Sequence, residues 1–423
     1  MRDIVITLIV FGSLPYILSK PYIGVLVWSW LGYMNPHRLA WGFAYDMPFA
    51  QIVAIVLFIS LAFNRETKRI PVTGLTVLWG LFLGWMCLST LYAVYPDGAQ
   101  TMLVKVFKIQ LIIWITMMVM VNRQRIELLL WVIVGSIGYF SIKGGVFTLA
   151  TGGAFRVWGP TGSYVEGNNE LALATLMVLP LMWYLRSVNT NKWVRLGLLG
   201  AIILSAVSAF GSHSRGALLA GLSMAFFLWL KGVSGMRKIV AGIAIVGSIA
   251  LLMAFMPDSW HERMGTIQTY EEDASAMGRI HSWLFAYNVA NDRFLGAGFE
   301  PWSFEMFAIY RPESPSAHAA HSIYFSVLGE HGWGGLILFL LILWVAWRTA
   351  SGIIREVKGN SDMEWLAQLA RMLQVSLVAY CTGGAFLSLS YYDLPWHIIS
   401  LLVIGKVIAQ KSKPDFNQSF VKS

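Results

Sequence analysis

Three histidines lie close together at the start of an apolar run, in "AHAAHSIYFSVLGEHGWGG" at positions 317–335. His321 is the candidate general base, because an imidazole with an unperturbed pKa of about 6.5 can accept a proton at neutral pH. His318 is a secondary candidate, since it shares a face with His321 if a helix has already begun there. Glu330 and His331 lie further into the apolar run, and we expect both to be structural.

Arginines in three separate motifs could bind an anion. Arg215 stands in "SHSRGALLA", Arg279 in "SAMGRIHSW" and Arg156 in "GGAFRVWGP". A guanidinium group offers a planar fork that matches phosphate oxygens, so these arginines together predict a membrane-embedded diphosphate ligand. Each arginine taken singly is equally well explained as a side chain that snorkels to the membrane surface.

No metal or nucleotide site is expected. His318, His321 and Glu330 are legitimate ligand types for zinc, but their spacing matches no familiar metal pattern. The acidic run at 271–273 is better interpreted as a solvated loop. The chain has no glycine-rich phosphate loop of the Walker or Rossmann kind. We therefore assign no metal and no cofactor.

The composition indicates a membrane protein that must position these residues with helices. Of 423 residues, 57% are hydrophobic and only 13% are charged, and apolar runs of about 20 residues recur throughout. Such runs predict an all-α polytopic membrane domain over residues 1–423. Residues 3–32 are a retained membrane segment, interpreted as one crossing broken at "SKPY" rather than two short crossings. Cys87 and Cys381 lie in apolar runs and are expected to be packing residues.

The net charge of +9 reflects membrane topology rather than nucleic-acid binding. Six basic connectors hold 18 Lys and Arg, whereas the intervening connectors hold 8, so the six are predicted to be cytoplasmic. The opposite side then carries a periplasmic loop at 141–167 and a large segment at 257–320, in which nine carboxylates accompany four arginines. A cytoplasmic tail at 411–423 completes a chain of about twelve crossings.

Four motifs, in order, resemble the O-antigen ligase and polymerase superfamily. They are "GNNELAL" at 167–173, "SHSRGALLA" at 212–220, "GRIHSWLFA" followed by "FLGAGF" within 278–299, and "HSIYFSVLGEHGWGG" at 321–335. The stretch at 144–174 resembles more narrowly the O-glycosylation-ligase branch, which is associated with exosortase systems in Gram-negative bacteria.

The resemblance implies a GT-C-like bundle of about twelve helices with a large periplasmic loop, in the bacterial inner membrane. It implies transfer of a glycan from undecaprenyl diphosphate to an acceptor hydroxyl, typically on lipid A-core, without nucleotide or metal. Arg215 and Arg279 would hold the diphosphate, with Arg156 as a further cation, and His321 would be the base. Asn169 in "GNNELAL" is a secondary candidate, and a monomer is favoured. The serine after His321 replaces the asparagine of many members, which leaves the role of that position open.

Two other functions stay open. A polymerase of the same superfamily would use the same donor with a second lipid-linked glycan as acceptor. A lipid-glycan transporter, from a different class, would place ionisable residues deep in the crossings and show paired halves. The candidate residues here gather on one side of the membrane instead, which argues against a transporter, whereas the motifs separate ligase and polymerase poorly.

Overall fold

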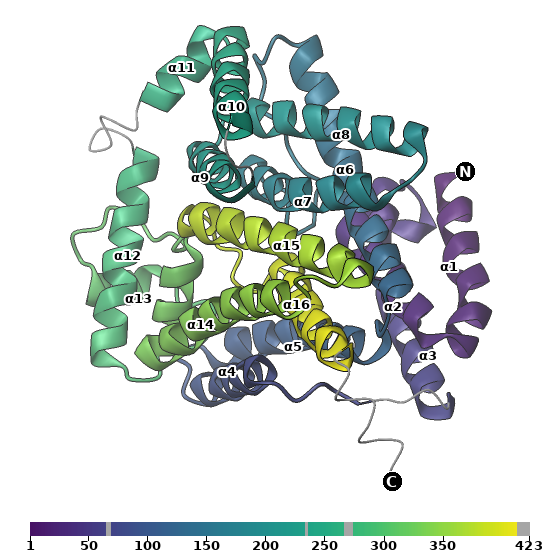
Figure 1. The fold of residues 1–423 in the computed structure, drawn as a ribbon. Coiled ribbons are helices and arrows are strands. Elements are labelled where there is room, and N and C mark those ends of the chain that lie inside the picture. The colour runs from purple at the N-terminus through teal and green to yellow at the C-terminus, as the bar shows by residue number, and fades with distance from the viewer. Residues whose placement is uncertain (65–68, 233–235, 266–273, 413–423) are drawn as a thin grey trace.

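The described residues of the computed structural model, 1–64, 69–232, 236–265 and 274–412, are helical, and no strand occurs among them. These residues form sixteen α-helices and four short 3-10 turns, arranged as in Figure 1. Their bounds are α1 Arg2–Ser19, α2 Pro21–Met34, α3 Phe49–Phe63, α4 Gly74–Leu91, α5 Pro96–Val119, α6 Arg123–Ala150, α7 Asn168–Val188, α8 Lys192–Gly211, α9 Arg215–Gly232, α10 Met236–Phe255, α11 Asp258–Gly265, α12 Ala274–Asp292, α13 Phe304–Tyr310, α14 Ile323–Glu356, α15 Glu364–Gly383 and α16 Asp393–Lys411.

Eight of the described helices are long and apolar enough to cross a membrane, namely α1, α4, α5, α6, α7, α8, α14 and α16. The bent pair Gly242–Phe255 and Asp258–Gly265, which turns by 114°, would make nine. The predicted count of twelve is not confirmed: α3 and the apolar part of α9 are shorter apolar helices, and α15 is not among the candidate spans. Helix α15 contacts α7, α9, α14 and α16 near the middle of the bundle (Figure 1), so its surface need not be apolar throughout.

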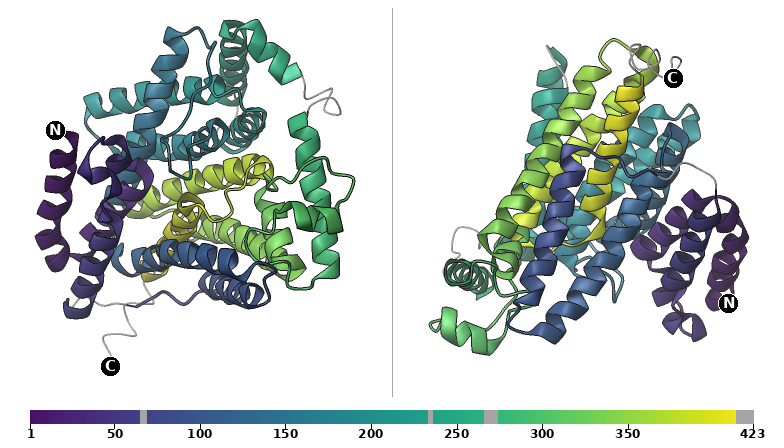
Figure 2. Two further views of the ribbon diagram at one scale, coloured as in Figure 1. Left: turned by 180° about the vertical axis from the view of Figure 1, so that it is seen from behind. Right: turned by 90° about the horizontal axis from the view of Figure 1, so that it is seen from below.

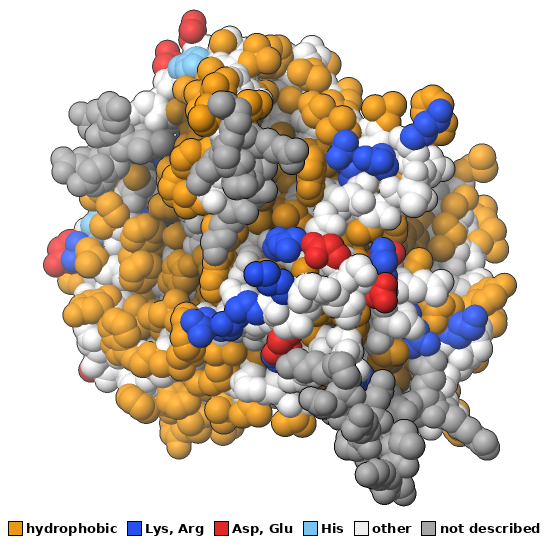
Figure 3. All heavy atoms as spheres, in the orientation of Figure 1, with side chains coloured by type: hydrophobic (Ala, Val, Ile, Leu, Met, Phe, Trp, Pro, Cys, Tyr) orange, Lys and Arg blue, Asp and Glu red, His pale blue; other side chains and the backbone are white. Residues whose placement is uncertain are grey.

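The outer surface is rich in large apolar side chains. Leu8, Leu251 and Trp344 are 66%, 73% and 59% exposed. On the face in Figure 3, charged side chains gather near the centre and hydrophobic side chains cover most of the rest. Apolar exposure on this scale is expected of helices that face lipid.

The first two helices form a hairpin, which corrects the expectation of a single broken crossing. Lys20 is extended and Pro21 begins α2, so the helix ends where the sequence suggested. The carboxylate of Asp3 then accepts hydrogen bonds from the backbone nitrogens of Gly42 and Ala44, at 3.0 and 3.1 Å. The start of α1 therefore lies near the chain that follows α2, beside α3 at one edge of the bundle (Figure 2).

Two predicted outer segments differ in their local structure from the simple loops expected. Helix α6 continues to Ala150, so the connector begins ten residues later than 141. The reason is close packing on α8, where a β-carbon at Gly145 would collide with the carbonyl group of Leu204. The segment 257–320 contains α11, α12 and α13. Residues 266–273 and 413–423, which include the acidic run and most of the predicted tail, lie outside the described residues.

Helix α14 is interrupted at Gly332, whose φ of 65° and ψ of −171° are not helical. The backbone nitrogens of Ala297 and Gly298 donate to the carbonyl groups of Gly329 and Glu330, at 3.0 and 2.9 Å. The "FLGAGF" motif thus satisfies carbonyl groups that the interruption would otherwise leave without partners.

Glu330 and His331 are buried beside this interruption and share one hydrogen-bonding partner. The Tyr391 hydroxyl lies 2.5 Å from the Glu330 carboxylate and 2.9 Å from Nε2 of His331. Ser89 binds the other ring nitrogen of His331, at 2.6 Å. Both residues therefore have side-chain hydrogen bonds inside the fold.

Candidate functional site

A narrow polar cavity lies where five separate segments meet. Its lining includes Asn169 of α7, Arg215 of α9, Arg263 of α11 and Arg279 of α12, and it is completed by Ser214, Gly216, Phe386 and Leu387. The three arginines are half-buried. The cavity measures about 10 Å³, which is room for about one water molecule. A larger ligand would need these side chains to move outward.

Arg215 is positioned by a rigid turn at the start of α9. The side chain of buried Asn168 donates to the carbonyl oxygen of Ser212 at 2.7 Å, and Nε2 of His213 lies 2.8 Å from the carbonyl oxygen of Gly153. His213 has a φ of 56°, in the left-handed region. Arg215 is the first residue of α9, so the positive end of the helix dipole adds to the charge of its guanidinium group.

Arg263 is the cavity residue that the sequence analysis missed. It lies on the eight-residue helix α11, which Trp260 anchors: the indole nitrogen donates to the carbonyl oxygen of Phe210 at 3.1 Å, and the two rings stack. Nε of Arg263 also donates to the carbonyl oxygen of His213, at 3.2 Å. Its only sequence signal was membership of the four arginines in the segment 257–320. Trp260 itself is buried in the protein.

Arg156 does not line this cavity but lies in a neighbouring one of about 380 Å³. Arg156 is exposed there, beside His213, Glu262 and Arg263. Arg263 thus borders both cavities, and it occupies the place of the third cation that Arg156 was expected to fill. Burial lowers the pKa of His213, and the charges of Arg156 and Arg263 lower it further, whereas the hydrogen bond to the Gly153 carbonyl raises it.

His321 lies in the two residues of chain that lead into α14. Its φ is 45°, a strained conformation for a residue other than glycine, and such strain often occurs at functional sites. Ser322 is the N-cap of α14 and accepts a hydrogen bond from the backbone nitrogen of Phe325, at 3.5 Å. Asparagine caps helices equally well, which accounts for the exchange of asparagine and serine after His321.

His321 is not among the residues that line the three-arginine cavity, contrary to expectation. It is nevertheless close enough to Arg279 for the arginine's charge to affect the pKa of His321. Burial lowers the pKa of His321 most, and Arg279 and His318 lower it further. A neutral imidazole is the form that can accept a proton.

Helix α12 holds the segment before His321. The hydroxyl of Ser282 donates to the carbonyl oxygen of His318 at 3.0 Å, and the indole nitrogen of Trp283 donates to that of Ala320 at 2.8 Å. A β-carbon at Gly278 would lie 3.2 Å from the His318 ring. One helix therefore carries Arg279 and also fixes the chain that presents His321.

His318 does not share a helical face with His321, because α14 begins only at Ile323. The His318 side chain is exposed, and its Nε2 lies 2.7 Å from the hydroxyl of Ser316. The helix that would have aligned the two histidines is therefore absent from this stretch.

A large apolar cavity adjoins the three-arginine cavity. It measures about 740 Å³ and is lined mainly by apolar side chains of α7, α8, α9 and α10, including Leu176, Trp183 and Leu252. Ser214 borders both cavities. A lipid chain in the larger space could thus present a polar head group to the arginines.

No group of three or more His, Cys, Asp or Glu side chains close enough to share a metal ion occurs among residues 1–64, 69–232, 236–265 and 274–412. The acidic run 271–273 falls outside those ranges.

Comparison with known families decides the wider class. Residues 200–340 match a family model described as O-antigen ligase. This match over about a third of the chain supports a place in the O-antigen ligase and polymerase superfamily. Residues 1–190 match a family of unknown function (DUF5935). No curated protein matches the chain.

The cavity is lined by residues from both matched segments. Arg215, Arg263, Arg279 and His321 lie within 200–340, and Asn169 lies within 1–190. The family and the long apolar helices together describe a multi-pass membrane protein of a glycosyl-transferring type.

Proposed function

We propose that the protein is an O-antigen ligase-type glycosyltransferase that moves a glycan from undecaprenyl diphosphate to an acceptor hydroxyl, most simply on lipid A-core. The observation that carries the proposal is the convergence of Arg215, Arg263 and Arg279 on one cavity, and the charge of Arg279 also acts on His321. We further propose that a monomer acts in the bacterial inner membrane with the site facing the periplasm, as the distribution of basic connectors suggests.

The donor is proposed to bind in two parts. Its diphosphate lies among the three arginines and Asn169, at the positive end of α9, after their side chains move apart. Its polyprenyl chain lies in the apolar cavity of about 740 Å³, which Ser214 joins to the arginines. Arg156, at the mouth of the neighbouring cavity, would attract the anionic donor rather than hold it.

The transfer needs one base and no metal. His321 takes the proton of the acceptor hydroxyl as its oxygen forms the new bond to the anomeric carbon. The bond from that carbon to the diphosphate oxygen breaks, and its electron pair leaves with the lipid diphosphate, where the arginines stabilise the gained charge. Attack opposite to the leaving group inverts the anomeric centre. Ser282 of α12 holds the backbone of His318 by a hydrogen bond, and the charge of His318 lowers the pKa of His321.

A transfer assay tests the proposal and separates it from both alternatives. Purified protein receives a lipid-linked donor together with either lipid A-core or a second lipid-linked glycan. We expect a glycosylated lipid A-core and release of undecaprenyl diphosphate. Extension of the second lipid-linked glycan alone would identify a polymerase. Movement of intact donor across a vesicle membrane, with no new glycosidic bond, would identify a transporter.

A further inference from the structure

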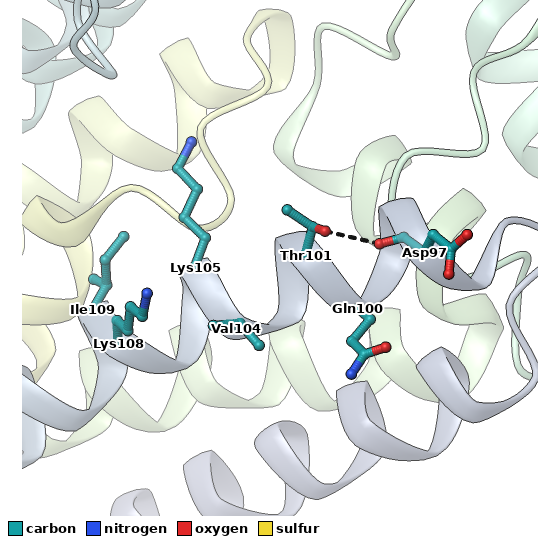
Figure 4. A pocket seen from close by; sticks show the side chains of 7 residues that line it. All are labelled: Asp97, Gln100, Thr101, Val104, Lys105, Lys108 and Ile109. Carbon is teal, nitrogen blue, oxygen red and sulfur yellow. Dashed lines mark hydrogen bonds between the residues drawn. The ribbon is translucent and has the colours of Figure 1, made fainter.

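A second groove lies on α5, and none of the residues that line it is assigned to the transfer. It measures about 770 Å³ and is lined by Asp97, Gln100, Thr101, Val104, Lys105, Lys108 and Ile109. Figure 4 shows that these side chains belong to successive turns of one helix, with the chain of Lys105 extending away from α5. The groove is open, and both lysines are exposed.

The two lysines lie well inside a candidate membrane span. Helix α5 has 24 residues and is therefore about 36 Å long. Lys105 and Lys108 are its tenth and thirteenth residues, about 14 and 18 Å along its axis. Cations at such depth are rare, and they usually face a cavity that serves a function.

No carboxylate neutralises either lysine among the residues that the structure describes. The ion pairs there do not include Lys105 or Lys108. Lys105 lies over the ring of Tyr164, with Nζ 4.4 Å from the ring centroid. Asp97 lines the same groove but at the first turn of α5. The groove therefore offers two cations that are not paired with a carboxylate, and it could bind an anion from outside the chain.

The groove adjoins the connector that leads to the three-arginine cavity. Ile109 also lines a smaller cavity of about 150 Å³, together with Ser163, Tyr164 and Asp393. Asn169 follows Ser163 by six positions, so the two α-carbons can be at most about 20 Å apart. An anion in the groove would thus lie near the proposed site of transfer.

We propose that Lys105 and Lys108 bind a phosphate group on the glycolipid acceptor, and so hold the acceptor beside the donor. The inference rests on the proposed function, because only an acceptor needs a second anionic site of this kind. The groove faces the lipid side of the bundle: Val104 and Leu111, on the same exposed face, are 45% and 50% exposed. A phosphorylated lipid can place its head group at the lysines and its chains along this apolar surface, which a free phosphate ion cannot do.

Binding of bisphosphorylated lipid A to the full-length protein in nanodiscs tests the proposal without any transfer step. The double variant Lys105→Gln/Lys108→Gln should bind lipid A at least about tenfold more weakly, because it loses one or two charge-assisted contacts. Dephosphorylated lipid A should bind the wild type and the double variant equally weakly. Lys143→Gln is the matched control, since Lys143 is an exposed lysine on another candidate span, and it should bind like wild type.

Equal binding of phosphorylated lipid A by the double variant and the wild type would overturn the proposal. Displacement by inorganic phosphate at the same concentration would identify a free-phosphate site, and equal binding of phosphatidylglycerol would identify a general lipid contact; either result overturns it. Arg215→Ala should retain lipid A binding while it loses the donor. Failure of transfer with lipid A binding intact would instead count against the proposed function alone.

Discussion

The indole nitrogen of Trp283 lies 2.8 Å from the carbonyl oxygen of Ala320, the residue immediately before His321. Trp283 stands four residues after Arg279 on α12, so this hydrogen bond links the anion-binding helix to the proposed base. The Trp283 ring also stacks on Phe325 of α14, with centroids 5.1 Å apart. Trp283 thus joins Ser282 in fixing the position of the chain that presents His321 relative to α12.

Replacing Trp283 by phenylalanine should impair catalysis more than binding. The variant keeps an aromatic ring on Phe325 but loses the donor to Ala320, so His321 can shift relative to the acceptor. We expect kcat to fall about ten- to hundredfold, as small displacements of reacting groups do, with the donor KM little changed. Steady-state transfer kinetics measure this split. Trp193→Phe, at an exposed position on α8, should behave like wild type. A rise in KM with unchanged kcat would contradict the positioning role.

Arg263 should be as important for the donor as Arg215 and Arg279, although the sequence did not single it out. Arg263→Ala should weaken donor binding by about ten- to hundredfold, because a charge-assisted contact to the donor is lost. Arg263→Lys should restore only part of this, because lysine lacks the bidentate fork. Isothermal titration with the lipid-linked donor measures the effect, and a thermal melt checks the fold. Arg348→Ala, near the other end of α14, is the control. Donor affinity like that of wild type in Arg263→Ala would exclude Arg263 from the site.

The sequence indicated which arginines to consider because their motifs fall on one side of the predicted topology. Arg215 and Arg279 do line one cavity. Arg263 escaped notice because its place depends on Trp260 meeting Phe210, fifty residues earlier in the chain. No local pattern reports such a contact.

Breaks in helices were visible in the sequence, but their geometry was not. Pro21 marked the end of α1 correctly, yet the return of α2 depends on Asp3 meeting residues 42 and 44. The pairing of His318 with His321 failed because Ser322 caps α14, so the helix begins too late to align them. Hydrophobic periodicity specifies which segments are helical, while partners far along the chain decide their direction.

The pH dependence of transfer should reflect the lowered pKa of His321. The base acts in its neutral form, so activity should fall with decreasing pH only below the ordinary histidine pKa of about 6.5. His318→Gln removes a positive charge that helps to lower this pKa, so the acid limb should move to higher pH. Profiles of kcat/KM for wild type and variant measure the shift. His281→Gln, on α12, should leave the limb in place. A shift to lower pH in His318→Gln would contradict the assignment.

The orientation in the membrane can be tested by cysteine labelling. In a background with Cys87 and Cys381 replaced by alanine, a cysteine at Glu313 should react with a membrane-impermeant maleimide in spheroplasts. A cysteine at Lys358 should react only after the membrane is permeabilised. Both positions are exposed, so a difference between them reports the side of the membrane. The reverse pattern would place the proposed site in the cytoplasm.

The most direct test of the account is transfer by His321→Ala with saturating donor and acceptor, measured with and without EDTA. We predict a loss of at least about a hundredfold, in the range that removal of a general base produces, with donor affinity within about twofold of wild type because the three arginines are untouched. His281→Ala should transfer normally, and EDTA should not affect the wild type. Transfer by His321→Ala at the wild-type rate, or a loss with EDTA that added metal restores, would contradict the proposed mechanism.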